Sequence, residues 1–250
     1  MSTILITGAS SGIGAEMARQ FAALGHDLAL AARRLDRLDA LRREISRGAH
    51  PEVRVTVWRL DVTDDDAVFD VFRAVADDFG SLDRVVINAG ISTGSPVGTG
   101  GYEGNRATAM TNFVAVLAQA EAALEIMRAQ EHGHLVFMSS FSALRGFTRS
   151  LTVYAATKAA VSNLAEGLRS EMQGAGLDIQ VTTILPGFIR TELTESIPDA
   201  PFMVDVEDGA RAIVAAIEAK KASALVPNWP WRPLAEVFKR APLGVVRRLS

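Results

Sequence analysis

Short apolar runs alternate along the chain with longer segments in which apolar residues recur every three or four positions. The short runs are rich in Val, Ile, Leu and Ala, as is typical of strands buried on both faces. The longer segments have the period of amphipathic helices. The predicted strands are residues 4–6, 27–31, 54–58, 84–87, 135–138, 179–184 and 224–226. The predicted helices are residues 12–24, 35–46, 64–79, 105–130, 153–173 and 208–219.

This alternation predicts a doubly wound α/β fold with a parallel sheet of about seven strands flanked by helices, because parallel neighbours need crossover connections. The chain has 250 residues, which suits one large domain. No shift in composition marks a second domain. We therefore assign residues 1–227 to a single domain that contains the active site, and residues 228–250 to a C-terminal tail.

The first predicted strand leads into a glycine-rich turn, Thr7-Gly8-Ala9-Ser10-Ser11-Gly12-Ile13-Gly14, which is followed by a helix. Glycines let the backbone approach a phosphate closely, and the start of a helix offers free N–H groups and a positive dipole end. The order of strand, turn and helix predicts a site for the pyrophosphate of a nucleotide. The alternative is a tight turn that binds no ligand.

A second candidate site is the pair Tyr154 and Lys158, four residues apart in a predicted helix and therefore on one face of it. A free tyrosine has a pKa of about 10 and is a poor base at neutral pH. We expect the Lys158 ammonium to favour the phenolate and lower the pKa of Tyr154, which would make the pair a proton-transfer device. The alternative is an exposed helical pair without a function.

The turn spacing G-x-x-x-G-x-G, together with Y-x-x-x-K, resembles the short-chain dehydrogenase/reductase family. The resemblance extends from Thr3 to about Pro227. It rests on motifs in the family's order, namely residues 7–14, Asp61-Val62, Asn88-Ala89-Gly90, Asn112, Ser139-Ser140, Tyr154 with Lys158, and Pro186-Gly187. It implies a Rossmann fold, a nicotinamide cofactor, and hydride transfer between that cofactor and a carbonyl compound or secondary alcohol.

The resemblance also indicates NADP(H) as the cofactor. Relatives that prefer NAD carry an acidic residue where this chain has Ala32, whereas here Arg33 and Arg34 follow. A guanidinium can hold a 2′-phosphate through two parallel hydrogen bonds, so we expect Arg33 to be the main determinant and Arg34 to support it. The alternative places both arginines on an exposed basic face of residues 33–47. Some NADP(H)-preferring relatives have a basic residue at the position of Ser11, and that second clamp is missing here.

Other cofactor contacts are implied in the same way. Asp61 would accept a hydrogen bond from the adenine amino group, although it could instead cap the next helix. The small residues after the fourth strand would let the adenosine ribose approach the sheet, and the loop after the sixth strand would hold the nicotinamide carboxamide. The predicted set is Gly8, Ser10, Ser11, Gly12, Ile13, Gly14, Arg33, Arg34, Asp61, Val62, Asn88, Ala89, Gly90, Tyr154, Lys158, Pro186, Gly187, Ile189 and Thr191.

The resemblance implies four catalytic residues: Asn112, Ser140, Tyr154 and Lys158. Tyr154 would be the general acid in reduction and the base in oxidation. Lys158 would lower its pKa and bind the nicotinamide ribose, and Ser140 would polarise the substrate carbonyl. Asn112 would position a water that relays protons to Lys158, although it could merely kink its helix.

The spacing from Ser140 to Tyr154 is one residue longer than is usual in the family, which we interpret as an insertion in the loop of residues 141–151. Ser139 and Ser142 are the alternatives to Ser140.

Composition narrows the function further. The formal net charge of −3 gives no global support for nucleic-acid binding, and the absence of cysteine excludes disulfides and cysteine-ligated metals. The four histidines do not cluster, so no metal site is predicted. His132 and His134 lie in a predicted loop and are expected to be solvated. No signal peptide or spanning segment is evident, so we expect a cytoplasmic protein.

The substrate is constrained only by the predicted pocket walls, residues 92–101, 141–147, Phe188 and 192–204. They are mostly apolar, with Arg145 and Arg149 as charged exceptions that could face solvent, and they suit a lipophilic ketone, aldehyde or secondary alcohol. An NAD-dependent alcohol dehydrogenase and a noncatalytic nicotinamide sensor are the alternative functions. The presence of Tyr154, Lys158 and Ser140 together favours an enzyme.

The tail of residues 228–250 combines tryptophans, prolines and a basic amphipathic segment over residues 234–249, interrupted at Pro242 and Gly244. Such a segment can pack on another subunit, close a substrate pocket or lie on an anionic membrane surface. We favour the first two. By resemblance to the family we also expect a homodimer or homotetramer, formed through the helices of residues 105–130 and 153–173.

Overall fold

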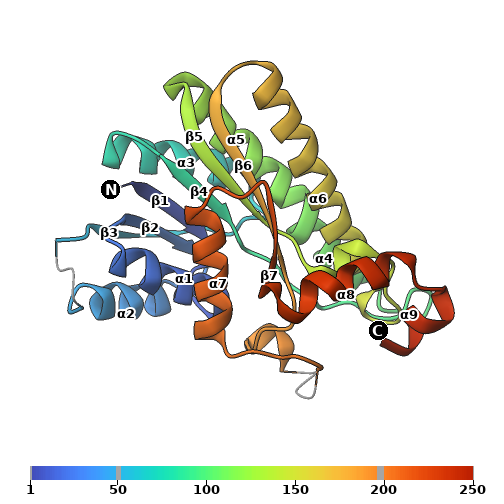
Figure 1. Ribbon diagram of the computed structural model, residues 1–250. Helices are drawn as coiled ribbons and strands as arrows, with labels where there is room; N and C mark the ends of the chain where they lie inside the picture. Colours follow the sequence, from blue (N-terminus) through green and yellow to red (C-terminus); the bar gives the residue numbers. More distant parts are fainter. Residues whose placement is uncertain (1, 49–51, 196–199, 250) are drawn as a thin grey trace.

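A seven-stranded parallel sheet forms the centre of the protein, with the strand order β3-β2-β1-β4-β5-β6-β7 (Figure 1). The computed structural model describes residues 2–48, 52–195 and 200–249. The strands are β1 (Thr3–Thr7), β2 (Asp27–Ala32), β3 (Val55–Arg59), β4 (Arg84–Ile87), β5 (His132–Met138), β6 (Asp178–Pro186) and β7 (Ser223–Val226). The predicted α/β fold is confirmed. The strand order reverses between β1 and β4, and in such sheets ligands bind outside the carboxyl ends of the strands at this point.

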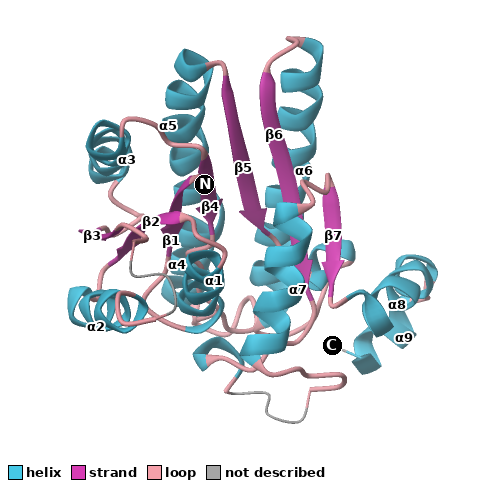
Figure 2. Ribbon diagram, turned by 60° about the vertical axis from the view of Figure 1, so that its left-hand side comes forward, coloured by secondary structure: helices cyan, strands magenta, loops and turns pink. Residues whose placement is uncertain are grey.

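Helices cover both faces of the sheet (Figure 2). The helices are α1 (Gly12–Ala23), α2 (Leu35–Ile45), α3 (Asp65–Phe79), α4 (Tyr102–Ala109), α5 (Ala115–Gln130), α6 (Leu151–Gly174), α7 (Val206–Glu218), α8 (Asn228–Arg240) and α9 (Leu243–Leu249). One apolar core lies between the sheet and α1, α2 and α7, and a second lies between the sheet and α3, α5 and α6. This two-sided burial explains why the strands read as continuous apolar runs.

The helix predicted over residues 105–130 is three connected pieces. It begins earlier, at Tyr102, and between α4 and α5 the backbone forms a π-helical segment, Met110–Val114. The amide of Ala115 donates to the carbonyl of Met110, five residues back. Apolar residues recur every three or four positions on both sides of this segment. The one extra residue of a π-helical turn disturbs this repeat too little for hydrophobic patterning alone to reveal it.

The prediction that His132 and His134 are solvated in a loop is wrong for His134, because β5 begins at His132 and carries both residues into the sheet. His134 is only 3% exposed. Its Nδ1 accepts from Arg84 Nε at 3.1 Å, so Nε2–H donates to Thr182 Oγ1 at 2.8 Å. Arg84 is itself buried and pairs with Glu218 of α7. This polar cluster joins β4, β5, β6 and α7.

Burial, with the positive charge of Arg84 and Lys220 added to it, lowers the pKa of His134 to about 3. His134 is therefore neutral at physiological pH.

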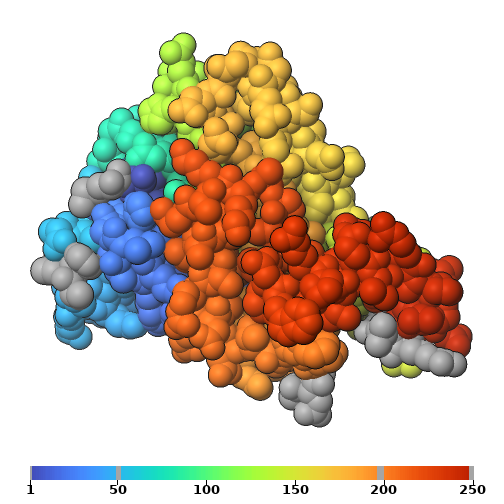
Figure 3. Space-filling model, viewed as in Figure 1, coloured from blue at the N-terminus to red at the C-terminus, as the bar shows by residue number. Residues whose placement is uncertain are grey.

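The C-terminal segment, residues 228–249, projects from one side of the molecule beyond β7 (Figure 3). Trp229 near the start of α8 has an extended backbone (φ −103°, ψ 132°), so the continuous helix begins after it, a few residues before the predicted start, and it breaks between Arg240 and Leu243 as Pro242 predicts. Its buried residues Trp231, Ala235, Phe238 and Val246 pack on Phe141 and Phe147.

Arg145 does not simply face solvent, because its Nη1 donates to the carbonyls of Phe238, Lys239 and Ala241 at the end of α8. Among the described helices, none is both long and apolar enough to cross a membrane.

Candidate active site

A cleft of about 910 Å³ opens at the carboxyl ends of the strands, where the strand order reverses. Every residue of the predicted cofactor set lines it, from Gly8 in the glycine-rich turn to Thr191 after β6. Ser140, Tyr154 and Lys158 line the same cleft, whereas Asn112 lies behind its wall and is fully buried. The topology therefore brings motifs more than 180 residues apart in sequence to one site.

The glycine-rich turn is fastened to the end of β4. Gly8 has a φ of +67°, and a Cβ there would lie 2.8 Å from the backbone of Ala89. The Asn88 side chain donates to the carbonyl of Thr7 at 2.9 Å, and the Thr7 hydroxyl accepts from the amide of Asn88 at 3.1 Å. Gly14 leaves room for the side-chain amide of Asn88, because a Cβ on Gly14 would lie 2.7 Å from Asn88 Nδ2. Asn88 thus shapes the turn, a role that the sequence motif alone did not reveal.

The two arginines after β2 are placed differently. Arg33 is exposed at the rim, with Nη1 4.0 Å from Asp61 Oδ2. Arg34 reaches back over the turn, where its Nη2 donates to Ser11 Oγ at 2.7 Å and its Nε to Ser10 Oγ at 3.1 Å. A basic group therefore does lie beside Ser11. It comes from Arg34, the residue just before α2, and not from the glycine-rich turn.

Across the mouth of the cleft, Glu192 pairs with both Arg34 and Arg37, at 3.3 Å and 2.5 Å. These arginines hold the pKa of the Glu192 carboxyl below its usual value, with Arg37 the larger influence.

Three serines, Ser139, Ser140 and Ser142, line the same cleft as Tyr154, the predicted proton donor. Ser139 is buried, and its hydroxyl contacts the carbonyl of Lys158 at 2.8 Å and Ser162 Oγ at 2.7 Å. Ser140 Oγ accepts from the amide of Ser142 at 3.1 Å, and of the three serines Ser140 is the one whose side chain acts to lower the pKa of Tyr154. Ser140 therefore stays the predicted partner of Tyr154, with Ser139 and Ser142 as the alternatives.

The protonation of the pair differs from the sequence expectation. Burial raises the pKa of Tyr154, and the Ser140 side chain only partly offsets this effect. The lowering expected from Lys158 is not found: its Nζ donates to the carbonyl of Met138 at 2.8 Å and lies 5.7 Å from the Tyr154 ring centroid. Burial also lowers the pKa of Lys158 to about 8. Tyr154 is therefore protonated at neutral pH, as a general acid must be.

Asn112 lies in the π-helical segment between α4 and α5. Its side chain forms two hydrogen bonds of 2.8 Å with the backbone of Ile91, one as donor and one as acceptor. A Cβ on Gly90 would lie 3.2 Å from Asn112 Oδ1 and 3.6 Å from Lys158 Nζ. Asn112 and Lys158 therefore flank the same glycine, and the lack of a side chain there keeps the space between them open.

The Asp61 carboxylate accepts from the amide and the hydroxyl of Thr63, at 3.1 Å and 2.8 Å. It turns the chain after β3, while Asp64 caps α3 by accepting from the amide of Ala67. The alternative of Asp61 as a helix cap is thus wrong.

The substrate half of the cleft is largely apolar. Of the predicted walls, Phe141, Phe147, Phe188 and Leu193 line it, while Leu144 and Arg149 do not. Residues 196–199 of the predicted wall lie outside the described residues. Thr93, from the predicted wall of residues 92–101, also lines the cleft, whereas Arg106, Met110, Leu151 and Trp231 line it without having been predicted. Arg106 and Met110 are four residues apart and therefore share one face of the helix, but nothing local in the sequence points to Trp231.

The comparisons with known proteins agree with this architecture. The profile of the short chain dehydrogenase family matches residues 2–201. An uncharacterized oxidoreductase of Mycobacterium tuberculosis is 45% identical over 247 residues, which cover 99% of this chain and 96% of that protein. The farnesol dehydrogenase of Aedes aegypti is 33% identical over 215 residues, covering 84% and 87% of the two chains.

Among solved structures, an alcohol dehydrogenase of the archaeon Thermococcus sibiricus complexed with 5-hydroxy-NADP superposes with a TM-score of 0.80 at 26% identity. The match covers 90% of this chain and 96% of that one. A parallel sheet with its cleft at the strand ends, carrying these motifs, defines a nicotinamide-dependent oxidoreductase. The chain belongs to the short-chain dehydrogenase family.

Proposed function

We propose that the protein is an NADP(H)-dependent oxidoreductase that interconverts a lipophilic carbonyl compound and its alcohol, with Tyr154 as the proton donor and acceptor. One observation carries this proposal: Ser140, Tyr154 and Lys158 line the same cleft as the glycine-rich turn. When bound, the nicotinamide supplies or accepts the hydride. The residues of the chain position the substrate and move the proton.

In reduction, Ser140 donates a hydrogen bond to the carbonyl oxygen, which stabilises the negative charge that develops on it. Tyr154 then transfers its phenolic proton to that oxygen and completes the alcohol. The raised pKa of Tyr154 keeps this proton in place at neutral pH. In oxidation the same tyrosine takes the proton back.

Lys158 and Asn112 resupply the proton. Because the pKa of Lys158 is lowered to about 8, its ammonium can release a proton near neutral pH at modest cost. Asn112 and Lys158 flank Gly90, and a water in the space beside this glycine would connect them. The carbonyl of Met138 orients the ammonium by accepting a hydrogen bond from it at 2.8 Å.

The cofactor residues fit NADP(H). The glycine-rich turn before α1 would take the pyrophosphate, with one guanidinium, that of Arg34, at Ser11 and a second, that of Arg33, at the rim of the cleft beside Asp61. Arg34 takes the place of the basic residue that the turn lacks, so we assign the 2′-phosphate to both arginines rather than mainly to Arg33. A structural neighbour, ElxO, is described with NADP bound, at 25% identity and a TM-score of 0.78.

An apolar substrate agrees with the walls of the cleft and with the farnesol dehydrogenase relative, whose name describes a lipophilic alcohol. We further propose a homodimer or homotetramer that works in the cytoplasm. Leu117 on α5 is 41% exposed beside a groove between α5 and α6, which is where a second subunit would pack.

The test is NADPH oxidation, followed by absorbance, with aldehydes and ketones of graded size. We expect Tyr154→Phe to abolish turnover and to bind NADPH as the wild type does. Arg33→Ala and Arg34→Ala should each weaken NADPH binding without weakening NADH binding. Equal loss for the two cofactors would contradict the assignment of the 2′-phosphate, and full turnover by Tyr154→Phe would contradict the mechanism.

A further inference from the structure

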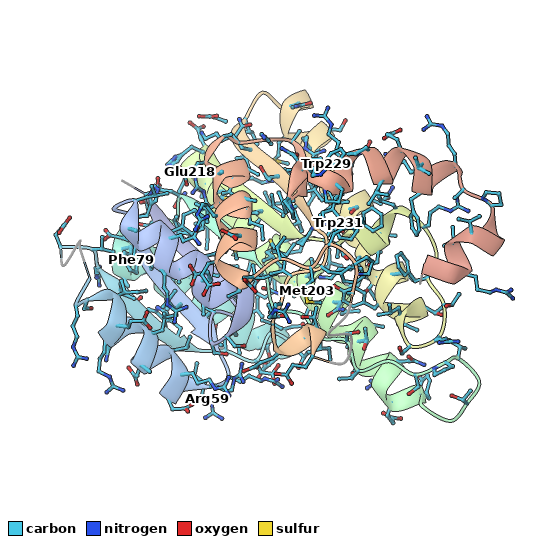
Figure 4. The ribbon with its side chains drawn as sticks, turned by 60° about the horizontal axis from the view of Figure 1, so that its bottom comes forward. Arg59, Phe79, Met203, Glu218, Trp229 and Trp231 are labelled. Atoms are coloured by element: carbon cyan, nitrogen blue, oxygen red, sulfur yellow. The ribbon has the colours of Figure 1, made fainter. Side chains whose placement is uncertain are left out.

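One side chain near the start of α8, that of Trp231, forms part of the wall of the cleft. Trp231 is only 3% exposed and lies directly on Gly187 in the loop after β6. A Cβ at Gly187 would fall 2.0 Å from Trp231 Cε2, so the indole occupies the space that any other residue at this position would fill. In Figure 4 Trp231 lies on the side of the segment nearer to the loop that carries Met203.

The indole joins the two walls of the substrate half of the cleft. Its centroid lies 4.7 Å from that of Phe141, the residue after Ser140, and 5.5 Å from that of Phe188. On the outer side, Phe202 meets it edge-on at 6.1 Å. The aromatic surface therefore begins one residue from the group that would hold the carbonyl and runs through Trp231 to the exposed ring of Phe202.

Packing, rather than polar contacts, fixes this side chain. Trp231 Nε1 is buried and has no hydrogen-bond partner among the described residues. The helix that carries it is held by Phe238, which stacks on Phe141 at 5.1 Å, and by the three carbonyl contacts of Arg145. A change from Trp231 to Phe would therefore alter the size of the wall without removing a hydrogen bond.

We propose that Trp231 determines the size of the substrate that the enzyme accepts. The inference rests on the proposed carbonyl chemistry and deepens it: the apolar part of the substrate, on the side of the carbonyl away from the cofactor, packs against the indole. The C-terminal segment is thus a wall of the substrate site. A bulky, branched or cyclic substituent that meets the indole is excluded, whereas a narrow apolar one gains contact area.

The test compares kcat/KM for NADPH-dependent reduction of ketones with increasingly bulky substituents by the wild type, Trp231→Ala and Trp231→Phe. Trp229→Ala is the matched control, because Trp229 lies two residues away and is 78% exposed. We expect Trp231→Ala to raise the ratio of kcat/KM for the bulkiest to the smallest ketone by about tenfold or more, a typical effect of changing pocket volume. The ratio for Trp231→Phe should lie between those of the wild type and Trp231→Ala, and the ratio for Trp229→Ala should match that of the wild type.

A purely structural role for Trp231 would lower kcat for every ketone by the same factor and leave the ratio unchanged, which would overturn the proposal. An equal effect of Trp229→Ala would overturn it as well. Should the wild type reduce no ketone, the proposed carbonyl chemistry fails separately. Calorimetric binding of the same ketones to the enzyme–NADPH complex then measures the size profile without turnover, and an unchanged profile in Trp231→Ala would refute the role of Trp231.

Discussion

The buried cluster around His134 predicts a specific loss of stability in mild acid. The pKa of His134 is lowered from 6.5 to about 3 in the folded protein, so between these values the unfolded chain binds one more proton than the fold does. The contribution of His134 to the free energy of unfolding is complete above about pH 6.5. It falls by about 1.4 kcal/mol for each pH unit below that value. At about pH 5 the loss amounts to about 2 kcal/mol.

The physical reason lies in the tautomer that the contacts fix. Nδ1 accepts from Arg84, so a second proton has to go on this nitrogen, where it would break the bond and face the guanidinium. His26, which contacts Glu218 at 3.5 Å, also has a lowered pKa because of its burial and titrates in the same direction. A comparison with a variant that lacks only His134 is therefore required.

The assay is urea unfolding of the wild type and His134→Gln at about pH 7.5 and about pH 5. Glutamine can accept from Arg84 and donate to Thr182 without titrating. We expect the wild type to lose about 2 kcal/mol more than the variant between these two conditions. Equal losses in the two proteins would refute the reasoning and would show that protonated His134 is accommodated in the fold.

Three further predictions concern the site and the assembly. The rate of carbonyl reduction should fall as the pH rises through about 8, because Lys158 then loses its proton, and a pH profile of kcat that stays level to pH 10 would contradict the relay. Gly187→Ala should destabilise the protein by about 1–3 kcal/mol through its clash with Trp231, whereas Gly167→Ala, in open space on α6, should stabilise it slightly; thermal unfolding compares the two. Leu117→Glu should convert the oligomer to smaller species in light scattering, and a wild type that is already monomeric at micromolar concentration would refute the oligomer.

Much of the fold and the site could be predicted from the sequence because both depend on local patterns. A strand buried on two faces is apolar throughout, and a helix that packs on a sheet repeats every three or four residues. The residues of the turn from Gly8 to Gly14 and the pair Tyr154 and Lys158 are close in sequence, so their spacing is informative. The parallel topology then brings them together without further information.

The rest depends on contacts between distant parts of the chain. The position of Trp231 results from aromatic packing across 90 residues, from Phe141 to the C-terminal segment. The pKa of Tyr154 was predicted with the wrong sign because the distance to Lys158 and the degree of burial are tertiary properties. His134 was misplaced because glycine and two histidines at the start of β5 lack the apolar character of a strand, although His134 is satisfied there by Arg84 and Thr182.

The π-helical segment at Met110–Val114 makes this helix sensitive to changes in chain length. It accommodates one residue more than a regular α-helix would between α4 and α5. Deleting a single residue here would regularise the hydrogen bonding and leave α4 and α5 on their present faces, but it would turn the residues inside the segment relative to both helices. Asn112 would then lose its two hydrogen bonds with the backbone of Ile91. Substitutions in this stretch can therefore be tolerated where insertions and deletions cannot, so homologues that share this site should align across it without gaps.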